Sequence, residues 1–314
     1  MIAGRAELLR QVRRFFDDRG FFEVQPPVLA RDCVVDAYLD PIAVPAEELG
    51  TSDPNRPRHY FLQTSPESAM KRMLAAGAPS IYSLGPVFRS GEFGQYHNIE
   101  FTMLEWYHRD AQVDHEIRLL GELACHTLAC DEVRVVRYRE LFRRHLSLDP
   151  ISCDLADLAR RVTRQDAELA QKLGADRDSL LDVLFSSVIQ PELTGPAAWI
   201  VRDYPLSQAA LAKQSTDDPE CAQRFELFFD GVEMANGYDE LLDADELIRR
   251  AEANNVKRQQ SGRRILEIET TLVAAMRRGL PECCGVALGF DRLLMKRMGV
   301  PQIRDVMPLP SDVV

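Results

Sequence analysis

Apolar and polar residues recur along the chain with two different periods, and these periods predict where helices and strands lie. Within residues 5–19 the apolar side chains follow the spacing of one helix face. They are Leu8, Leu9, Val12, Phe15 and Phe16. Gly20 is expected to close this helix, and residues 21–29 predict a strand interrupted by prolines. The chain therefore begins with a helix and a short extended segment.

The next part of the chain predicts a loop, a strand and a helix in that order. Residues 45–59 are rich in Pro, Glu, Asp and Arg without periodicity, which is typical of a loop. Residues 60–63 predict a short strand. A helix is then expected to start at residues 64–67, with Pro66 in its first turn.

Two hairpins are predicted from pairs of apolar runs. Residues 81–88 and 99–107 flank a polar turn that contains glycine, and they predict a hairpin with a long loop. A second hairpin is predicted over residues 224–241, where Asp-Gly at 230–231 marks the turn between its strands. The first hairpin is long enough to hold one ligand along its length.

The remaining apolar patterns are helical in the middle of the chain and mixed towards its end. Residues 111–192 are mostly helical by pattern, with Asp178 as a candidate N-cap, and they offer no candidate chemistry. Residues 198–205 predict a strand. Residues 285–298 predict a Gly-rich strand that passes into a helix.

The composition limits the class of partner without naming one. With 314 residues, 46% of them hydrophobic, the chain can bury one large core or two modest ones. Its formal net charge of −11 argues weakly against a nucleic-acid partner, because phosphate contacts need Lys and Arg. No apolar run approaches the roughly 20 residues that a bilayer requires, and no secretory signal is evident, so we expect a cytoplasmic protein. The seven cysteines lack the paired spacing of zinc sites and are expected to be reduced.

The first hairpin carries residues suited to a nucleotide and an amine together. Arg89 offers a planar fork of donors that fits a phosphate, and His97 lies across the loop, where it can touch a more distal phosphate. Phe101 can lie flat against a purine. Glu105 and Tyr107 point to one side of their strand and can face a cation. A surface hairpin with solvated ion pairs would show similar residue types, since exposed pairs are nearly neutral in energy.

Further charged residues lie at the ends of other predicted elements. Glu226, Glu233 and Glu240 are spaced seven residues apart, and burying three acids is costly unless a cation or donor meets them. Magnesium carried on ATP phosphates and a substrate ammonium group are the two candidates. Glu67 starts a helix, where the helix dipole alone would favour an acid. Arg292 enters at the start of the last predicted helix.

Residues 88–107, FRSGEFGQYHNIEFTMLEWY, resemble motif 2 of the class II aminoacyl-tRNA synthetases in the version used by lysyl-tRNA synthetases. The opening helix and the segment around Pro27 look like motif 1, which builds the dimer interface in that family. The pattern G-x-x-x-G-x-D-R-L at 285–293 resembles motif 3. The resemblance implies an α+β fold with a mixed, mainly antiparallel sheet flanked by helices. It implies a single catalytic domain over 1–314, with a helical segment at about 111–192, and a homodimer.

The resemblance also implies a reaction and its site residues. The reaction uses ATP and Mg²⁺ to form an aminoacyl-adenylate, with Arg89 and Arg292 as the catalytic residues. The implied ATP-binding residues are Arg89, Glu92, His97, Asn98, Phe101, Glu226, Glu233 and Arg292. Glu226 and Glu233 are also the implied metal ligands. The implied amino-acid site consists of Ser65, Glu67, Glu105, Tyr107, Asn236, Glu240 and Ala287.

Within the family, the chain resembles the ligases that join (R)-β-lysine to a lysine side chain of elongation factor P. Lysyl-tRNA synthetases carry an N-terminal anticodon-binding domain, which we expect this chain to lack because it begins at the motif 1 helix. Ser65 stands where the synthetases have alanine, and Ala287 where they have glycine. One methyl group in a pocket can discriminate between isomers by roughly 1 to 3 kcal/mol. Neutral drift between small residues is the alternative explanation.

One departure from the family pattern and two other functions stay open. Gly91 occupies the position of an acid near the adenine, and the neighbouring Glu92 is the candidate substitute. A truncated lysyl-tRNA synthetase that uses tRNA or another acceptor would share these motifs. A synthetase-like protein that only binds or regulates would be expected to have lost its phosphate ligands, which are all present here.

Overall fold

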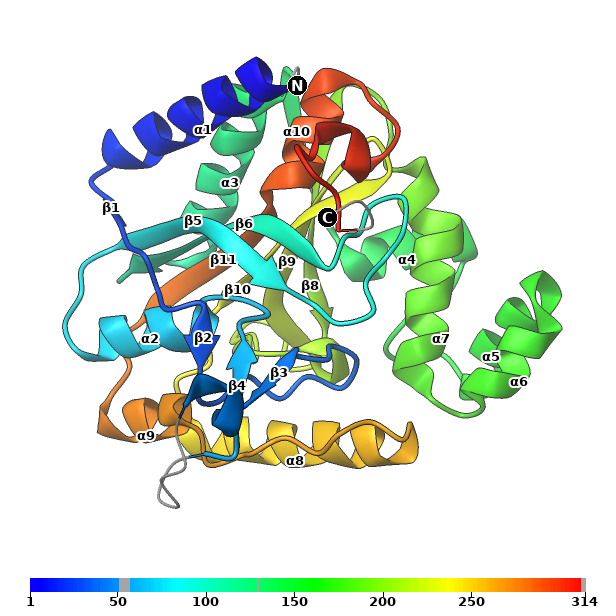
Figure 1. The fold of residues 1–314 in the computed structure, drawn as a ribbon. Helices are drawn as coiled ribbons and strands as arrows, with labels where there is room; N and C mark the ends of the chain where they lie inside the picture. Colours follow the sequence, from blue (N-terminus) through cyan, green and yellow to red (C-terminus); the bar gives the residue numbers. More distant parts are fainter. Residues whose placement is uncertain (51–56, 129, 312–314) are drawn as a thin grey trace. The chain divides into compact units, whose positions relative to one another are not determined.

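The computed structural model describes residues 1–50, 57–128 and 130–311. The chain divides into two compact units. The first unit comprises Met1–Gln112 and Glu240–Val314, and the second comprises Val113–Asp239. Each unit contains β-strands and helices (Figure 1). The predicted α+β class is confirmed by this content and by the mainly antiparallel pairing of the strands.

Four strands of the first unit neighbour one another in the order β1-β5-β6-β11. They are β1 (Phe22–Glu23), β5 (Ile81–Phe88), β6 (Glu100–Arg109) and β11 (Cys283–Gly289). Strand β6 is antiparallel to both β5 and β11, whereas β1 is parallel to β5. The first predicted hairpin is confirmed. The predicted Gly-rich strand also forms, as β11.

A smaller sheet of the first unit has the order β2-β4-β3. Its strands are β2 (Leu29–Ala30), β3 (Ala43–Pro45) and β4 (His59–Leu62). The predicted loop at 45–59 is wrong at Ala46–Leu49, which forms a 3₁₀ helix closed by Gly50. Residues 51–56 of that predicted loop lie outside the described residues. Helix α8 lies along this small sheet (Figure 1), and an apolar cluster of Val35, Ala251 and Leu266 includes Phe61 of β4 at its edge.

The helices of the first unit are α1 (Ile2–Asp17), α2 (Glu67–Ala75), α8 (Ala244–Gln260), α9 (Thr271–Arg278), α10 (Phe290–Met298) and the 3₁₀ helix Ile303–Val306. Helix α1 buries four of the five predicted apolar residues, and Leu9 is half-buried. The ring of Phe16 stacks on Tyr82 of β5 with centroids 4.9 Å apart. Pro66 precedes α2 as its N-cap and is not in the first turn as predicted. The packing of α1 and α2 thereby fixes the strands that carry the candidate site.

The strands of the second unit run in the order β10-β9-β8-β7. They are β7 (Glu132–Arg137), β8 (Ala197–Pro205), β9 (Cys221–Phe229) and β10 (Val232–Asp239). The predicted β9–β10 hairpin is confirmed, and Asp230 and Gly231 both have positive φ at its turn. The helical prediction for 111–192 is wrong at β7. That segment is rich in Val and Arg and pairs in parallel with β8, so tertiary pairing prevails over the helical surroundings.

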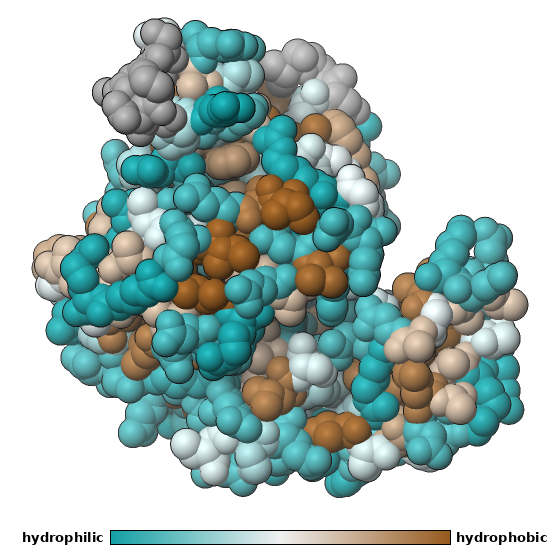
Figure 2. Space-filling model, turned by 90° about the horizontal axis from the view of Figure 1, so that it is seen from below, coloured by the Kyte–Doolittle hydropathy of each residue, from teal (hydrophilic) through white to brown (hydrophobic). Residues whose placement is uncertain are grey.

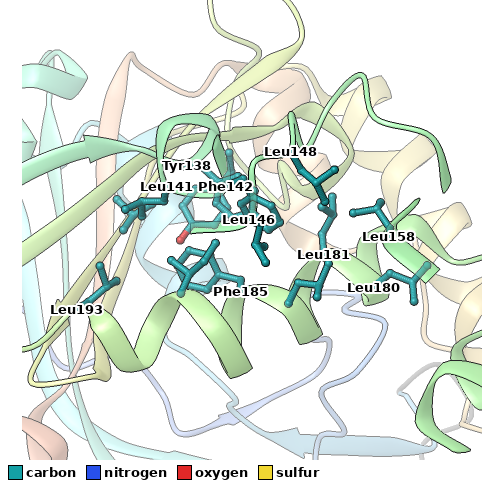
Figure 3. Close-up of a cluster of buried hydrophobic side chains, with 14 of the residues drawn as sticks. Tyr138, Leu141, Phe142, Leu146, Leu148, Leu158, Leu180, Leu181, Phe185 and Leu193 are labelled. Atoms are coloured by element: carbon teal, nitrogen blue, oxygen red, sulfur yellow. The ribbon is translucent and has the colours of Figure 1, made fainter. Parts of the chain in front are cut away.

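The helices of the second unit are α3 (Val113–Thr127), α4 (Tyr138–Leu146), α5 (Leu155–Gln165), α6 (Ala167–Leu173) and α7 (Arg177–Leu184), with short turns at Phe185–Ile189, Gln190–Glu192 and Leu206–Gln208. Asp176 occupies the N-cap position of α7. The prediction of Asp178 as the N-cap is therefore wrong by two residues. A buried cluster of aromatic and leucine side chains joins α4 to α7 (Figure 3). In it, the Tyr138 ring stacks on Phe185 with centroids 5.3 Å apart.

The surface is mainly polar on the face shown in Figure 2, where hydrophobic side chains form separate groups among hydrophilic ones. Exposed apolar residues include Val256 and Ile265, near the end of α8. Among the described residues, every helix is too short or too polar to cross a lipid bilayer.

Candidate active site

A pocket of buried polar side chains lies in the first unit, against strand β6. The Tyr107 hydroxyl donates a hydrogen bond of 2.7 Å to Glu105 Oε1 on the same side of the strand. The Ser65 hydroxyl donates to the other oxygen, Glu105 Oε2, also at 2.7 Å. Ser65 itself accepts from the backbone N–H of Glu67 at 3.0 Å. The structure therefore brings together four residues that the sequence assigned to one amino-acid site.

The pocket already contains a cation, the ammonium group of Lys71 on helix α2. Its Nζ lies 2.5 Å from Glu67 Oε1 and 2.5 Å from Glu240 Oε2. It also lies 5.7 Å from the centroid of the Tyr107 ring. The Lys71 side chain is only 3% exposed, and that of Glu240 only 1%. Glu240 thus joins Glu67 and Glu105 in a set of three carboxylates around one internal cation.

Burial controls the ionisation of this set of side chains. Burial raises the pKa of Glu105 to about 7, and the charge of Glu67 adds to the effect. Burial likewise raises the pKa of Glu240 to about 8, although Lys71 opposes the change. Burial alone would lower the pKa of Lys71, but Glu240 and Glu67 raise it. Lys71 is therefore charged, and Glu105 and Glu240 hold their protons to higher pH than ordinary carboxyl groups do.

Strand β11 contributes two small residues to this pocket. Gly285 lies directly opposite Tyr107 in the β6–β11 pairing, and Ala287 lies opposite Glu105. A Cβ atom on Gly285 would overlap Glu240 Oε1 and lie 2.5 Å from Tyr107 Cε1. Directly paired residues point to the same face of a sheet, so the methyl group of Ala287 lies on the face that carries Glu105. The absence of a side chain at 285 leaves room for the carboxylate and the ring.

Arg89, the predicted α-phosphate ligand, directly follows β5. Its backbone N–H donates to the Ile99 carbonyl at 2.9 Å, and its Nε donates to the Thr64 carbonyl at 3.3 Å. The guanidinium carbon lies 5.1 Å from the centroid of the Phe101 ring. Glu92 Oε1 is 3.8 Å from Arg89 Nη1, a loose contact of little energy. Hydrogen bonds to two backbone carbonyls therefore hold the Arg89 guanidinium beside Phe101, the residue predicted to stack on adenine.

Arg292 and His97, both predicted to bind outer phosphates, lie next to each other. Arg292 is in the first turn of α10, and its Nε donates to the Tyr96 carbonyl at 3.1 Å. Its Nη2 lies 2.9 Å from His97 Nε2. Because arginine only donates, His97 Nε2 accepts and the ring is neutral, with its proton on Nδ1. Partial burial and the charge of Arg292 both lower the pKa of His97, in agreement with a neutral ring.

Asn98 and Gly91, in the loop of the same hairpin, have surroundings that the sequence did not indicate. The Asn98 amide is buried and donates to the Glu100 carbonyl at 2.6 Å and to the Ser311 hydroxyl at 2.8 Å. The Ser311 N–H donates back to Asn98 Oδ1 at 3.3 Å. Asn98 therefore ties the hairpin loop to the C-terminal segment. Gly91 has a φ of +77°, so an acid at that position would be strained.

In the second unit, Glu226 is held by two donors on strands β8 and β9. The Tyr204 hydroxyl donates to Glu226 Oε2 at 2.6 Å, and Arg224 forms an ion pair with Oε1. Arg224 Nε also donates to Asn236 Oδ1 at 3.3 Å. Burial raises the pKa of Glu226; Arg224 opposes this change, and the charge of Glu233 adds to it. Glu226 is thus a buried carboxylate that a second cation would stabilise.

A β-bulge places the three predicted site residues of β9 and β10 on one face. These residues are Glu226, Glu233 and Asn236. Asn236 pairs with Glu226 and Glu233 pairs with Phe228, and directly paired residues share a face. Glu233 and Asn236 are three residues apart, which would put them on opposite faces of a regular strand. The bulge between Glu233 and Ala235 adds one residue to β10, so both side chains point to the same face.

The donor set of Glu226 and Glu233 fits magnesium. Both are carboxylates on one face, and Mg²⁺ is commonly bound by one or two carboxylates together with substrate phosphates. The charge of Glu233 raises the pKa of Glu226, which indicates that the two acids are close enough to repel. Each oxygen of Glu226 accepts one donor and keeps a further lone pair for a metal.

The sequence matches a family model described as class II tRNA synthetases (D, K and N), over residues 1–313. The chain belongs to this family. Class II membership confirms the fold that the three motifs implied. In this family context the β5–β6 hairpin is motif 2, and β11 with α10 is motif 3.

Several curated proteins are similar to this class II chain over nearly its whole length. The elongation factor P–(R)-β-lysine ligase of Yersinia enterocolitica serotype O:8 is 40% identical over 306 residues, which cover 98% of this chain and 93% of the relative. The ligase of the same name from Yersinia pestis strain Pestoides F is 38% identical over 309 residues, covering 98% and 94% respectively. The corresponding Yersinia pseudotuberculosis serotype O:1b protein has the same values.

Three residues that contact predicted site residues within their own unit are absent from the sequence-based assignment. Lys71 contacts Glu67 and Glu240, and Arg224 and Tyr204 contact Glu226. A lysine on a helix and an arginine on a strand usually face solvent, so their type gives no sign of burial. The available signal for these partners was the predicted burial of the acids, because a buried carboxylate requires a nearby cation or hydrogen-bond donor.

Proposed function

We propose that this chain is an ATP-dependent ligase that activates (R)-β-lysine and joins it to a lysine side chain of elongation factor P. The observation that carries the proposal is the set of three carboxylates around Lys71, of which Glu105 and Glu240 are buried and Glu67 is half-buried. When all three carboxylates are ionised, the one internal cation leaves an excess of two negative charges. A diamino acid supplies two ammonium groups to balance them. The names of the similar proteins identify (R)-β-lysine as the diamino acid to test.

The pocket residues divide between the two amino groups of the substrate. Glu105, Tyr107 and Glu240 surround the side-chain ammonium, and Glu67 binds the other amine. Ser65 and Ala287 line the same pocket, where a hydroxyl and a methyl group set which isomer fits. Discrimination of this kind is worth roughly 1 to 3 kcal/mol. Asn236 in the second unit binds the substrate carboxylate.

In the first half-reaction, the amino-acid carboxylate attacks the α-phosphorus of ATP. The bond from the α-phosphorus to the bridging oxygen breaks, pyrophosphate leaves, and an aminoacyl-adenylate forms. The carboxylate is already ionised at pH 7, so no general base is required. Catalysis then rests on positioning and on charge stabilisation. Arg89 binds the α-phosphate, and Arg292 with neutral His97 binds the outer phosphates.

Phe101 of β6 stacks on the adenine and Glu92 accepts from its amino group, while Asn98 holds the loop that carries Glu92. Glu226 and Glu233 would hold magnesium. When bound, magnesium neutralises phosphate charge that would otherwise oppose the attack. In the second half-reaction, a neutral lysine amine of elongation factor P attacks the activated carbonyl carbon and AMP leaves.

We also propose the cellular setting of the ligase. The two units act as one catalytic domain, and two copies associate through the motif 1 segment, where Phe22 is 61% exposed and Pro27 is exposed. The ligase acts in the cytoplasm, where translation factors are made and used. Its net charge of −11 argues weakly against tRNA as the acceptor.

A transfer assay tests this function. The purified chain is incubated with ATP, Mg²⁺, labelled (R)-β-lysine and either elongation factor P or lysine tRNA. We expect label on one lysine of elongation factor P and none on the tRNA. The variant Arg89→Ala should lose transfer, whereas Arg249→Ala, in an exposed pair with Glu246 on α8, should retain it. Label on tRNA, or no label on either acceptor, would refute the proposal.

A further inference from the structure

Lys71 has no role in the activation chemistry described above, yet it occupies the centre of the amino-acid pocket. Its ammonium group makes two contacts of 2.5 Å, to the carboxylates of Glu67 and Glu240. Those two carboxylates are the ones proposed to receive different amino groups of the substrate. Because both oxygens touch the same nitrogen, their separation can be no more than twice the length of one contact. Lys71 therefore links the two amine subsites.

The surroundings of Lys71 contain acids on three sides and no second cation among the pocket residues described above. Helix α2 contributes Glu67, the segment after β10 contributes Glu240, and β6 contributes Glu105 and Tyr107. Strand β11 contributes the buried Cys283 together with Gly285 and Ala287 on this face, and none of the three is a cation. Removal of Lys71 would leave the half-buried Glu67 and the buried Glu105 and Glu240 without internal compensation. Uncompensated buried carboxylates take up protons rather than stay charged.

We propose that Lys71 is a positioning residue that holds Glu67 and Glu240 close together and favours their ionised forms, so that each can receive one amino group. The inference rests on the proposed function, because it assigns two amino groups to this pocket. Lys71 neutralises one of three carboxylates and leaves two for the two ammonium groups of a diamino acid. Without Lys71 a proton takes its place, and the substrate must displace that proton in order to bind.

The consequence is a specific change in the pH dependence of substrate binding. In the Lys71→Met variant, binding is accompanied by the release of about one more proton than in the wild type. The ratio of the variant KM to the wild-type KM for (R)-β-lysine should therefore fall about tenfold for each pH unit between pH 7 and 9. At pH 7 this ratio should be about 100. The kcat at saturating substrate should change little, since Lys71 contacts none of the proposed phosphate ligands in the structure.

The experiment measures ATP–pyrophosphate exchange from pH 6.5 to 9 with (R)-β-lysine. The wild type is measured first, because exchange by the wild type separates a failure of this inference from a failure of the proposed function. Lys172→Met is the matched control. Lys172 pairs with Glu168 at i,i+4 spacing as Lys71 does with Glu67, but its side chain is 70% exposed. It should keep wild-type KM values at every pH.

A double variant distinguishes positioning from a purely structural role. Lys71→Met combined with Glu105→Gln returns the pocket to two carboxylates, so it should fold even where the single variant is unstable. It should lose the tenfold dependence per pH unit, while its KM stays above the wild-type value because the Glu105 contact is missing. Calorimetry in two buffers of different ionisation enthalpy should count the extra proton released by the single variant. An unchanged pH profile in Lys71→Met, with only kcat or thermal stability reduced, would overturn the inference.

Discussion

Glu105 provides a direct test of the electrostatic account. Its buried charge should lower the folding stability of the protein and strengthen the binding of the amino acid. Burial raises the pKa of this carboxyl from 4.5 to about 7. A group whose pKa is raised by folding holds its proton more tightly in the folded protein. The resulting penalty is small near pH 4.5, grows as the pH rises towards 7, and is constant above that value. Glu105→Gln has no charge to bury and should escape this penalty.

The size of the effect follows from the change in pKa. A change of about 2.5 units corresponds to about 3 kcal/mol once the carboxyl is fully ionised. Most of this difference, about 2 to 3 kcal/mol, develops between pH 5 and pH 8. At roughly 2 °C per kcal/mol for a protein of this size, Glu105→Gln should melt about 6 °C above the wild type at pH 8. At pH 5 the two proteins should melt within about 2 °C of each other.

The assay is thermal unfolding at both pH values, with and without (R)-β-lysine. The amino acid should raise the Tm of the wild type at pH 8 more than that of Glu105→Gln, because the variant lacks one of the charges that receive the ammonium group. Glu100→Gln, on the same strand but exposed, is the control and should match the wild type. The reasoning would be refuted if Glu105→Gln raised the Tm equally at pH 5 and pH 8, or if it lowered the Tm at pH 8.

Three further substitutions test other parts of the site. Gly285→Ala places a Cβ atom against Glu240 and Tyr107, and it should raise the KM for the amino acid by about tenfold or more, with the KM for ATP unchanged in exchange assays. Ala287→Gly should move the ratio of kcat/KM for (R)-β-lysine over α-lysine towards α-lysine by roughly tenfold; an unchanged ratio would assign the position to neutral drift. Tyr204→Phe removes a donor to a proposed metal ligand and should raise the Mg²⁺ concentration for half-maximal exchange by about tenfold, in a titration with ATP held constant.

The elements that carry the site are largely predictable from local pattern. The β5–β6 hairpin and the β9–β10 hairpin form where apolar runs and Asp-Gly indicate them, because their register depends on nearby residues. Strand β7 is different. It lies between two helices and is only six residues long, and it becomes a strand through pairing with β8 more than 60 residues later. Such a contact leaves no periodic signal in the surrounding sequence.

The acids of the site are also easier to predict than the groups that neutralise them. Glu105 and Glu226 lie on apolar strands, where burial is expected and a partner is required. The partners Lys71 and Arg224 are identified only by the structure, since many Lys and Arg residues could fill that role. The bulge between Glu233 and Ala235 is also identified only by the structure. It brings Glu233 and Asn236 to the same face of the sheet, although their spacing of three residues would put them on opposite faces of a regular strand. These features depend on packing between distant segments.

The central claim, that the chain activates (R)-β-lysine in a pocket of three carboxylates around Lys71, is tested most directly by ATP–pyrophosphate exchange. The purified protein is supplied with ATP, Mg²⁺ and labelled pyrophosphate, and (R)-β-lysine is compared with α-lysine at equal concentrations. The account predicts strong exchange with (R)-β-lysine and exchange at least tenfold weaker with α-lysine. Exchange with α-lysine alone would identify a lysyl-tRNA synthetase-like enzyme, and exchange with neither amino acid would contradict the account.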